Sequence, residues 1–280
     1  MSQKKKDQFV IAYIADLDDY LTVVGYAREL AHFLKKGLIL LFICDKHYTK
    51  ISTDEAQVKL TAIKALYPDD DITYCALNGR TREIINLLPT LLNGVIVVAG
   101  VNRKASLLNP TNPYRVIRDF GQCKIAYLTV QPNLKNTFSF QHVALRIDYN
   151  KESKEKLIWS SYFARFNNSN LHVLHEEYKD SGLRTKFDNN MVFLHKFFSN
   201  LNVSYQQEVM PSTGNFLDSL AAKQANDKCY DLMVCVTTDT RELDVLDWII
   251  GRPENRVIKN RERLPILFIN PRDDIYVLCD

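Results

Sequence analysis

The sequence lacks the segments that direct a chain into or across a membrane. Its basic start, Lys4 to Lys6, is followed by acidic residues and not by the apolar core, about 7–15 residues long, of a signal peptide. The longest apolar stretch, Leu38 to Cys44, is far shorter than the ~20 residues that a membrane-spanning helix needs. We therefore expect a soluble protein with no membrane partner.

Cysteine pairs are also missing. The 6 cysteines form no Cys-x-x-Cys motif, and several of them lie inside apolar, strand-like runs. Reduced thiols of a protein core have this distribution, whereas secreted disulfide scaffolds and zinc sites do not. The expected location is the cytoplasm.

Neither sign of charge dominates the sequence. It has 36 basic and 33 acidic residues, a net charge of +3, and no basic stripe with interleaved aromatic residues. Such a balance gives no reason to expect a nucleic-acid partner. The apolar fraction of 46% and the 280-residue length are sufficient for two packed cores.

The common catalytic motifs are absent as well. The sequence contains no Gly-x-Ser-x-Gly elbow, no P-loop and no His-Glu-x-x-His. His172 and His175 are three residues apart in a strand-like run, so their side chains should point to opposite faces and not share a metal. His142 and His195 have no evident partner. We expect neither catalysis nor a metal site.

What the sequence does contain is a regular alternation of short apolar runs and helical patterns. In the first half, strand-like runs at Phe9 to Ile14, Leu38 to Cys44 and Val95 to Ala99 are separated by amphipathic segments. The runs are continuously apolar, which is typical of parallel strands covered by helices on both faces. The sequence therefore predicts a doubly wound, Rossmann-like α/β domain.

The same pattern then starts again. Val143 to Ile147, which ends at Asp148, corresponds to the first strand, and Asn202 to Tyr205 corresponds to Asp71 to Tyr74. We predict two tandem domains, residues 1–134 and 139–280, each with a five-stranded parallel sheet.

The last unit of the second half is the most informative stretch. From Asp231 to Pro271 it has the pattern strand, loop, helix, strand, with apolar runs at Leu232 to Val236 and Pro265 to Ile269. Such a unit brings backbone N–H groups and a helix start to the carboxyl edge of the sheet, where phosphates bind in other proteins.

With this order of elements, each half resembles a universal stress protein domain, and the whole chain resembles the tandem form of that family. The fold implied is adenine-nucleotide alpha-hydrolase-like. ATP-binding members carry an Asp after the first strand and the pattern G-x2-G-x9-G-[ST] in the last unit. By resemblance, Asp148 matches that Asp and Gly251 matches the third glycine. In the first half, Ala15 stands at the Asp position and Arg103 at the second glycine, so we expect no ATP site there.

Two interpretations of the second-half site remain open. Bulky side chains could fill the phosphate cradle, or Arg241, Arg252 and Arg256 could replace its backbone donors with guanidinium groups. The residues assigned to this site, for ATP or another adenine nucleotide, are Asp148, Gly214, Thr237, Thr238, Arg241, Gly251 and Arg252.

Three functions are compatible with these patterns. The first is a regulatory or binding protein of the stress response with a degenerate nucleotide site. The second is an ATP-binding module with slow hydrolysis, and the third is an enzyme of another nucleotide-handling α/β family. The resemblance also implies an intramolecular pseudo-dimer of the two domains through the strands Lys124 to Val130 and Pro265 to Ile269, while a homodimer and an unknown protein partner remain open.

Overall fold

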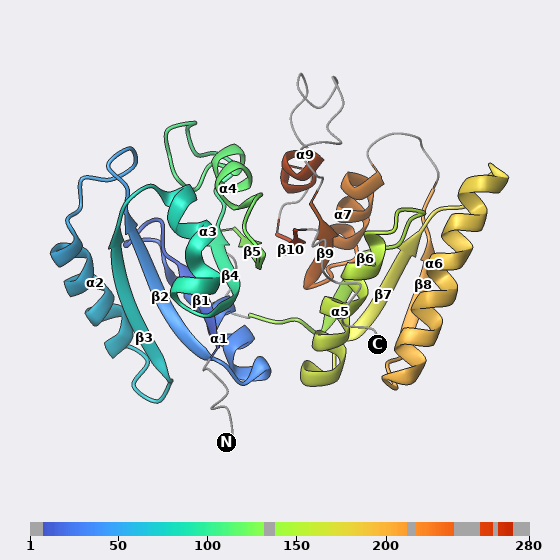
Figure 1. Ribbon diagram of the computed structural model, residues 1–280, viewed down its shortest axis with the longest axis horizontal. Coiled ribbons are helices and arrows are strands. Elements are labelled where there is room, and N and C mark those ends of the chain that lie inside the picture. The colour runs from blue at the N-terminus through green and yellow to red at the C-terminus, as the bar shows by residue number, and fades with distance from the viewer. Residues whose placement is uncertain (1–7, 132–137, 212–216, 238–252, 260–262, 271–280) are drawn as a thin grey trace. The chain divides into compact units, whose positions relative to one another are not determined.

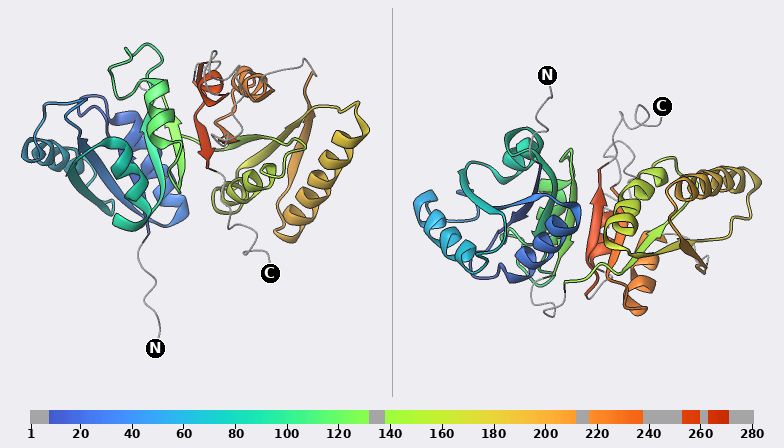
Figure 2. Two further views of the ribbon diagram at one scale, coloured as in Figure 1. Left: turned by 45° about the horizontal axis from the view of Figure 1, so that its top comes forward. Right: turned by 90° about the horizontal axis from the view of Figure 1, so that it is seen from below.

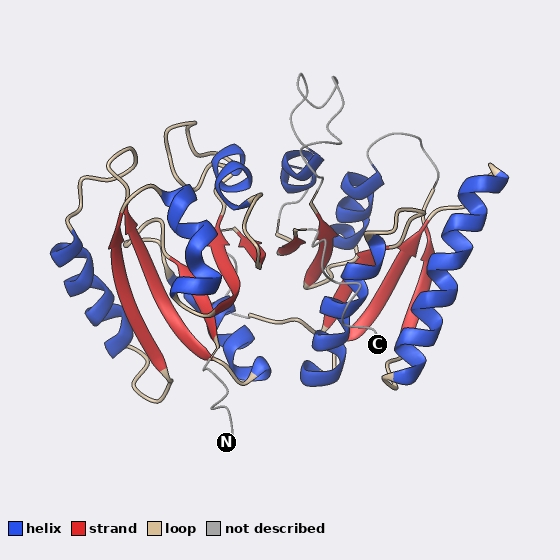
Figure 3. Ribbon diagram, in the orientation of Figure 1, coloured by secondary structure: helices blue, strands red, loops and turns tan. Residues whose placement is uncertain are grey.

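The structure is a computed structural model that describes residues 8–131, 138–211, 217–237, 253–259 and 263–270 (Figure 1). The chain divides into two compact units, unit 1 with residues 1–139 and unit 2 with residues 140–280. Both units are built from parallel strands alternating with helices (Figure 3).

Unit 1 has a five-stranded sheet in the order β3-β2-β1-β4-β5, and every neighbouring pair is parallel. Its strands are β1 (Phe9–Tyr13), β2 (Gly37–Cys44), β3 (Ile72–Asn78), β4 (Gly94–Gly100) and β5 (Ala126–Val130). The central strands are buried along almost their whole length because helices cover both faces, as the continuous apolar runs predicted.

Four helices connect these strands. They are α1 (Leu21–Leu34), α2 (Thr53–Ala65), α3 (Thr81–Leu91) and α4 (Pro113–Phe120). Right-handed crossovers put α1 and α2 on one face and α3 and α4 on the other, as the right-hand view of Figure 2 shows. Side chains cap the N-termini of two of these helices. Ser52 accepts a hydrogen bond from the N–H of Glu55 at the start of α2, and Asn112 accepts one from the N–H of Tyr114 at the start of α4.

Unit 2 repeats the same architecture in the sheet order β10-β9-β6-β7-β8, again with parallel pairs. Its strands are β6 (His142–Arg146), β7 (Asn170–His175), β8 (Tyr205–Val209), β9 (Leu232–Val236) and β10 (Ile266–Ile269). Its described helices are α5 (Ser153–Asn167), α6 (Ser181–Asn200), α7 (Leu217–Asp227) and α9 (Pro253–Lys259). The two predicted five-stranded parallel sheets are confirmed.

Two helices of unit 2 differ from the sequence-based expectation. The apolar pattern from Phe187 to Leu201 predicts a helix, but α6 begins earlier, at Ser181, where the Asp180 carboxylate accepts the N–H of Leu183 at 2.8 Å. Its first turns are polar and exposed, so apolar periodicity cannot detect them. Helix α7 was not expected, and the helix expected from Leu243 to Ile250 lies outside the described residues.

Candidate functional site

Asp148 lies in the loop after β6, at the carboxyl edge of the unit 2 sheet. Strand β6 is the central strand of this sheet, between β9 and β7. At the carboxyl end of such a strand, the chain connections on its two sides go to opposite faces of the sheet and leave a crevice between them. Ligands of open α/β sheets bind in this crevice. Asp148 is 4% exposed, and the carboxylate therefore needs partners that compensate for the loss of water.

The chain itself supplies those partners. Arg146 Nη2 donates to Oδ2 of Asp148 at 2.6 Å, and the backbone N–H of Asn150 donates to Oδ1 at 3.0 Å. The hydroxyl of Ser153, the first residue of α5, also donates to Oδ1. Both carboxylate oxygens of Asp148 are thus engaged by residues within five positions of it.

Arg146 is the centre of a buried ionic cluster. Its Nε donates to Oδ1 of Asp218 on α7 at 2.6 Å, and its Nη1 lies 3.9 Å from Oε1 of Glu176, which follows β7. A second cation, Lys156 on α5, donates to the carbonyl oxygen of Arg146 at 2.7 Å. The loops after β6 and β7 and helix α7 therefore converge on one guanidinium group.

The charges of this cluster stabilise one another. Burial alone would raise the pKa of Asp218, but the positive charges of Arg146 and Lys156 outweigh burial and lower this pKa to about 2. Burial would lower the pKa of Arg146, and the carboxylates of Asp218 and Asp148 raise it instead. Arg146 and Asp218 are consequently both charged at neutral pH.

The loop around Asp148 is also fixed from α6. The side-chain amide of Asn190 donates to the carbonyl oxygens of Asp148 and Asn150, both at 2.8 Å. Asn190 is one of three buried residues on this 20-residue helix. The backbone of the Asp148 loop is therefore held in place without a ligand.

Thr237 is the second predicted site residue that the structure describes. It follows β9, its N–H donates to the carbonyl oxygen of Ile269 at 2.9 Å, and its hydroxyl donates to Oδ1 of Asn270 at 2.7 Å. These bonds connect the carboxyl ends of β9 and β10. The other predicted site residues lie outside the described residues; they are Gly214, Thr238, Arg241, Gly251 and Arg252.

In unit 1, the corresponding loop between β4 and α4 is folded on itself by three asparagines. The side-chain oxygens of Asn102 and Asn109 each accept the N–H two residues further on, both at 2.9 Å. Asn112 also donates its amide to the carbonyl oxygen of Ala105 at 2.8 Å. Sequence reasoning missed these residues, although asparagine next to proline and threonine is a signal of such turns.

Two histidines that had no evident partner in the sequence do have one. Nδ1 of His142 lies 3.2 Å from Nε2 of His172, whose Nδ1 lies 3.3 Å from Oε1 of Glu208. Nδ1 of His195 lies 2.6 Å from the hydroxyl of Tyr205. The prediction that His142 and His195 lack a partner was wrong because their partners lie on other elements, which the sequence alone does not bring together. Across the described ranges, no group of three or more metal-ligating side chains occurs.

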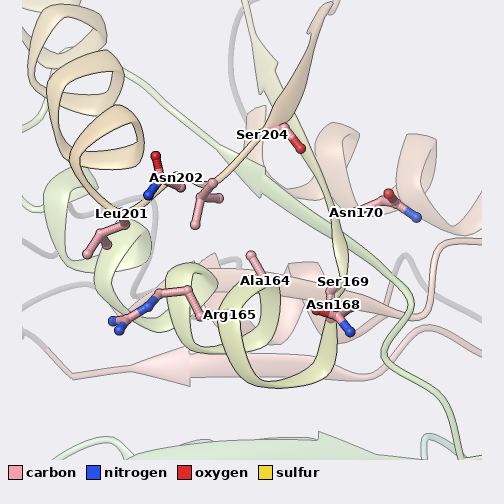
Figure 4. Close-up of a pocket in the computed structure, with 9 residues that line it drawn as sticks. Ala164, Arg165, Asn168, Ser169, Asn170, Leu201, Asn202 and Ser204 are labelled. Atoms are coloured by element: carbon pink, nitrogen blue, oxygen red, sulfur yellow. The ribbon is translucent and has the colours of Figure 1, made fainter.

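A polar groove of about 480 Å³ lies at the opposite edge of the unit 2 sheet. It is formed where α5 and α6 end and where β7 and β8 are about to begin (Figure 4). Asn168 and Asn202, which end these helices in left-handed backbone conformations, both line it. The groove is thus distinct from the Asp148 crevice.

No family model and no curated protein matches the sequence. Solved structures do match it. A universal stress protein from Archaeoglobus fulgidus DSM 4304 has a TM-score of 0.65 at 14% identity, covering 95% of this chain and 97% of its own. A protein of unknown function from Pseudomonas aeruginosa PAO1 has the same TM-score and identity, covering 98% and 96%.

The cytoplasmic domain of a prokaryotic cation chloride cotransporter also matches, with a TM-score of 0.57 at 10% identity and 94% and 95% coverage. These likenesses show that the chain has the tandem universal stress protein fold, as its sequence predicted. They also show that this fold occurs in proteins with different functions. Among the described helices, none is long and apolar enough to cross a membrane.

Proposed function

We propose that this chain, which has the tandem universal stress protein fold, is a cytoplasmic regulatory or binding protein of the stress response whose nucleotide site in unit 2 is degenerate. The observation that supports this proposal is the bond from Arg146 to Asp148 at 2.6 Å. An adenine nucleotide that used Asp148 as its acceptor would have to displace a buried guanidinium group that also serves Asp218. Losing such a partner is strongly unfavourable for a buried carboxylate.

The fold also supports a regulatory rather than a catalytic role. Side chains of the chain itself already bind both carboxylate oxygens of Asp148, and the cotransporter domain is an example of this fold within a larger membrane protein. A regulatory protein of this kind would act by contacting a protein partner. The implied pseudo-dimer of the two domains and a further homodimer belong to the same proposal, and light scattering of the purified chain measures the second.

The test is a calorimetric titration of the full chain with Mg-ATP and with cyclic AMP, for the wild type and for Gly251→Trp. The expected result is the absence of saturable heat at millimolar nucleotide in both proteins. Saturable binding by the wild type that is lost in Gly251→Trp would overturn the degenerate site and support the alternative, an ATP-binding module with slow hydrolysis.

A genetic experiment tests the stress-response role separately. We expect that deleting the gene in the source organism lowers survival under at least one of heat, oxidative and starvation stress. Both the wild type and Gly251→Trp should restore survival equally, because the proposed role does not need the nucleotide. Restoration by the wild type alone would contradict this.

A further inference from the structure

Two arginines of unit 1 converge on a single tyrosine. Arg115 and Arg118 are one turn apart on α4, and both donate to the hydroxyl oxygen of Tyr48 in the loop between β2 and α2. The distances are 2.7 Å from Nη1 of Arg115 and 2.5 Å from Nη2 of Arg118. Two guanidinium groups of like charge are thus held against one neutral oxygen.

Other residues of the chain fix the orientation of both arginines. Nε of Arg115 donates to the carbonyl oxygen of Leu107, and the guanidinium lies 4.8 Å from the centre of the Tyr48 ring. Nε and Nη2 of Arg118 bind Oδ1 of Asp119 at 2.8 and 2.7 Å. Asp119 is 3% exposed, so this anchor is part of the core. The arrangement is therefore formed before any ligand arrives.

The cluster has more donors and more positive charge than the chain uses. Within the part of the chain that the structure describes, Nη2 of Arg115 and Nη1 of Arg118 make no hydrogen bond, and 51% of the Arg118 side chain is exposed. Asp119 is the one carboxylate that contacts these arginines there. Lys46 and His47, directly before Tyr48, are exposed and add basic character to the same loop.

The position of the cluster suits a ligand site. Tyr48 belongs to the loop after β2 and the arginines belong to the helix after β4, and β1 lies between these two strands in the sheet. Helix α4 stands at the edge at which the strand arrows end (Figure 1). This carboxyl edge is where open α/β sheets bind their ligands.

We propose that Tyr48, Arg115 and Arg118 form a binding site for a dianionic phosphate group, either inorganic phosphate or the phosphate monoester of a small molecule. Two guanidinium groups, which offer Nη2 of Arg115 and Nη1 of Arg118, match the charge and the several oxygens of a phosphate dianion better than those of a monoanionic carboxylate. The site uses side chains of unit 1 and so goes beyond the function proposed above, which concerns the nucleotide crevice of unit 2.

The experiment is a calorimetric titration at pH 8 and low ionic strength with inorganic phosphate and with ribose 5-phosphate. We expect saturable binding by the wild type and a loss of about tenfold or more in affinity for Arg115→Gln and for Arg118→Gln. Arg82→Gln on α3 of the same unit is the matched control, because it removes the same charge from an arginine that pairs with Gln122 instead. Tighter binding of ribose 5-phosphate identifies an ester as the ligand, and equal binding identifies free phosphate.

Absence of saturable binding by the wild type at about ten millimolar phosphate would overturn the site, as would an equal loss in Arg82→Gln. If an arginine variant fails to fold, the wild type is titrated with phosphate instead, and the arginine Nε–Hε signals are followed in a ¹⁵N correlation spectrum. Signals that phosphate does not shift would also overturn the site. Mg-ATP binding that is lost in Arg118→Gln but kept in Gly251→Trp would belong to this site and would leave the proposal for unit 2 intact.

Discussion

Nη2 of Arg146 lies 2.6 Å from Oδ2 of Asp148, two residues further along the chain. Asp148, the loop residue that the resemblance assigns to a ligand, is thus bound by the strand residue Arg146. The same guanidinium group also binds Asp218, so one buried side chain joins the loop after β6 to helix α7.

Replacing Arg146 by methionine should destabilise the protein strongly. Asp148 and Asp218 would lose their shared partner in a buried place, which typically costs about 3–5 kcal/mol. Urea unfolding followed by circular dichroism measures this change. Arg184→Met on α6 is the control, since the Arg184 side chain is 71% exposed and should change stability by no more than about 0.5 kcal/mol.

A second substitution tests the cause of that loss. In the Arg146→Met background, Asp148→Asn should recover part of the stability because it removes one of the uncompensated buried charges. If Asp148→Asn destabilises the Arg146→Met variant as much as it does the wild type, the two residues are not coupled and the ionic explanation is incorrect.

Stability should fall as the pH decreases below about 6.5. Burial lowers the pKa of His172, and this effect exceeds the opposite effect of Glu208. The unfolded state, with a histidine pKa near 6.5, then binds the proton more readily than the folded state does. The contribution of His172 is therefore complete above this pH and is lost on acidification. Glu208 stays ionised in this range because its pKa is lowered to about 2.

The measurement is the free energy of unfolding between pH 7.5 and 5.5 for the wild type and for His172→Phe. The phenyl ring keeps the stacking on Tyr230, whose ring centre lies 4.1 Å from that of His172. The variant should show a flatter dependence on pH, whereas His32→Gln at an exposed position of α1 should not. An identical slope in the wild type and in His172→Phe would contradict the assignment.

Gly25→Ala should destabilise unit 1 although alanine is the better helix former. A Cβ at Gly25, in the middle of α1, would overlap the ring of Phe138, which packs edge-on against Tyr26. Overpacking costs about 1–3 kcal/mol, against a gain of about 1 kcal/mol in helix propensity. In a Phe138→Ala background the same change should instead stabilise the helix. Urea unfolding of the four proteins decides between these signs.

Thiol labelling should distinguish one cysteine from the others. In a Cys279→Ser background, chosen because Cys279 lies outside the described residues, Ellman's reagent should modify Cys229 quickly, the half-buried Cys75 more slowly, and the three buried thiols only after unfolding. Cys229 is exposed, whereas Cys44, Cys123 and Cys235 are buried. Burial also raises the pKa of Cys123 to about 11, so its reactive thiolate is scarce at pH 8. Rapid modification of two or more thiols in the native protein would contradict the packing.

The sequence predicted the buried strands better than it predicted the polar starts of the helices. A continuous apolar run such as Leu38 to Cys44 identifies a strand that is buried on both faces. The neighbouring elements need not be known, because residues that point to either face are apolar. Polar segments carry no such signal. Helix α6 begins earlier than expected because Asp180 caps an exposed first turn, and α7 was missed although it contributes Asp218 to the ionic cluster.

By itself, the sequence determined that this chain is a repeat of two doubly wound α/β units, because the order of strands and helices follows from local periodicity. It also placed Asp148 directly after the first predicted strand of the second unit. Only the tertiary structure decided the ionic cluster around Asp148, since Arg146, Glu176 and Asp218 lie on strand β6, after β7 and on helix α7. The same holds for Tyr48 and Arg115, 67 residues apart in the chain. Local patterns place elements, but the pairing of buried charges depends on how the elements pack.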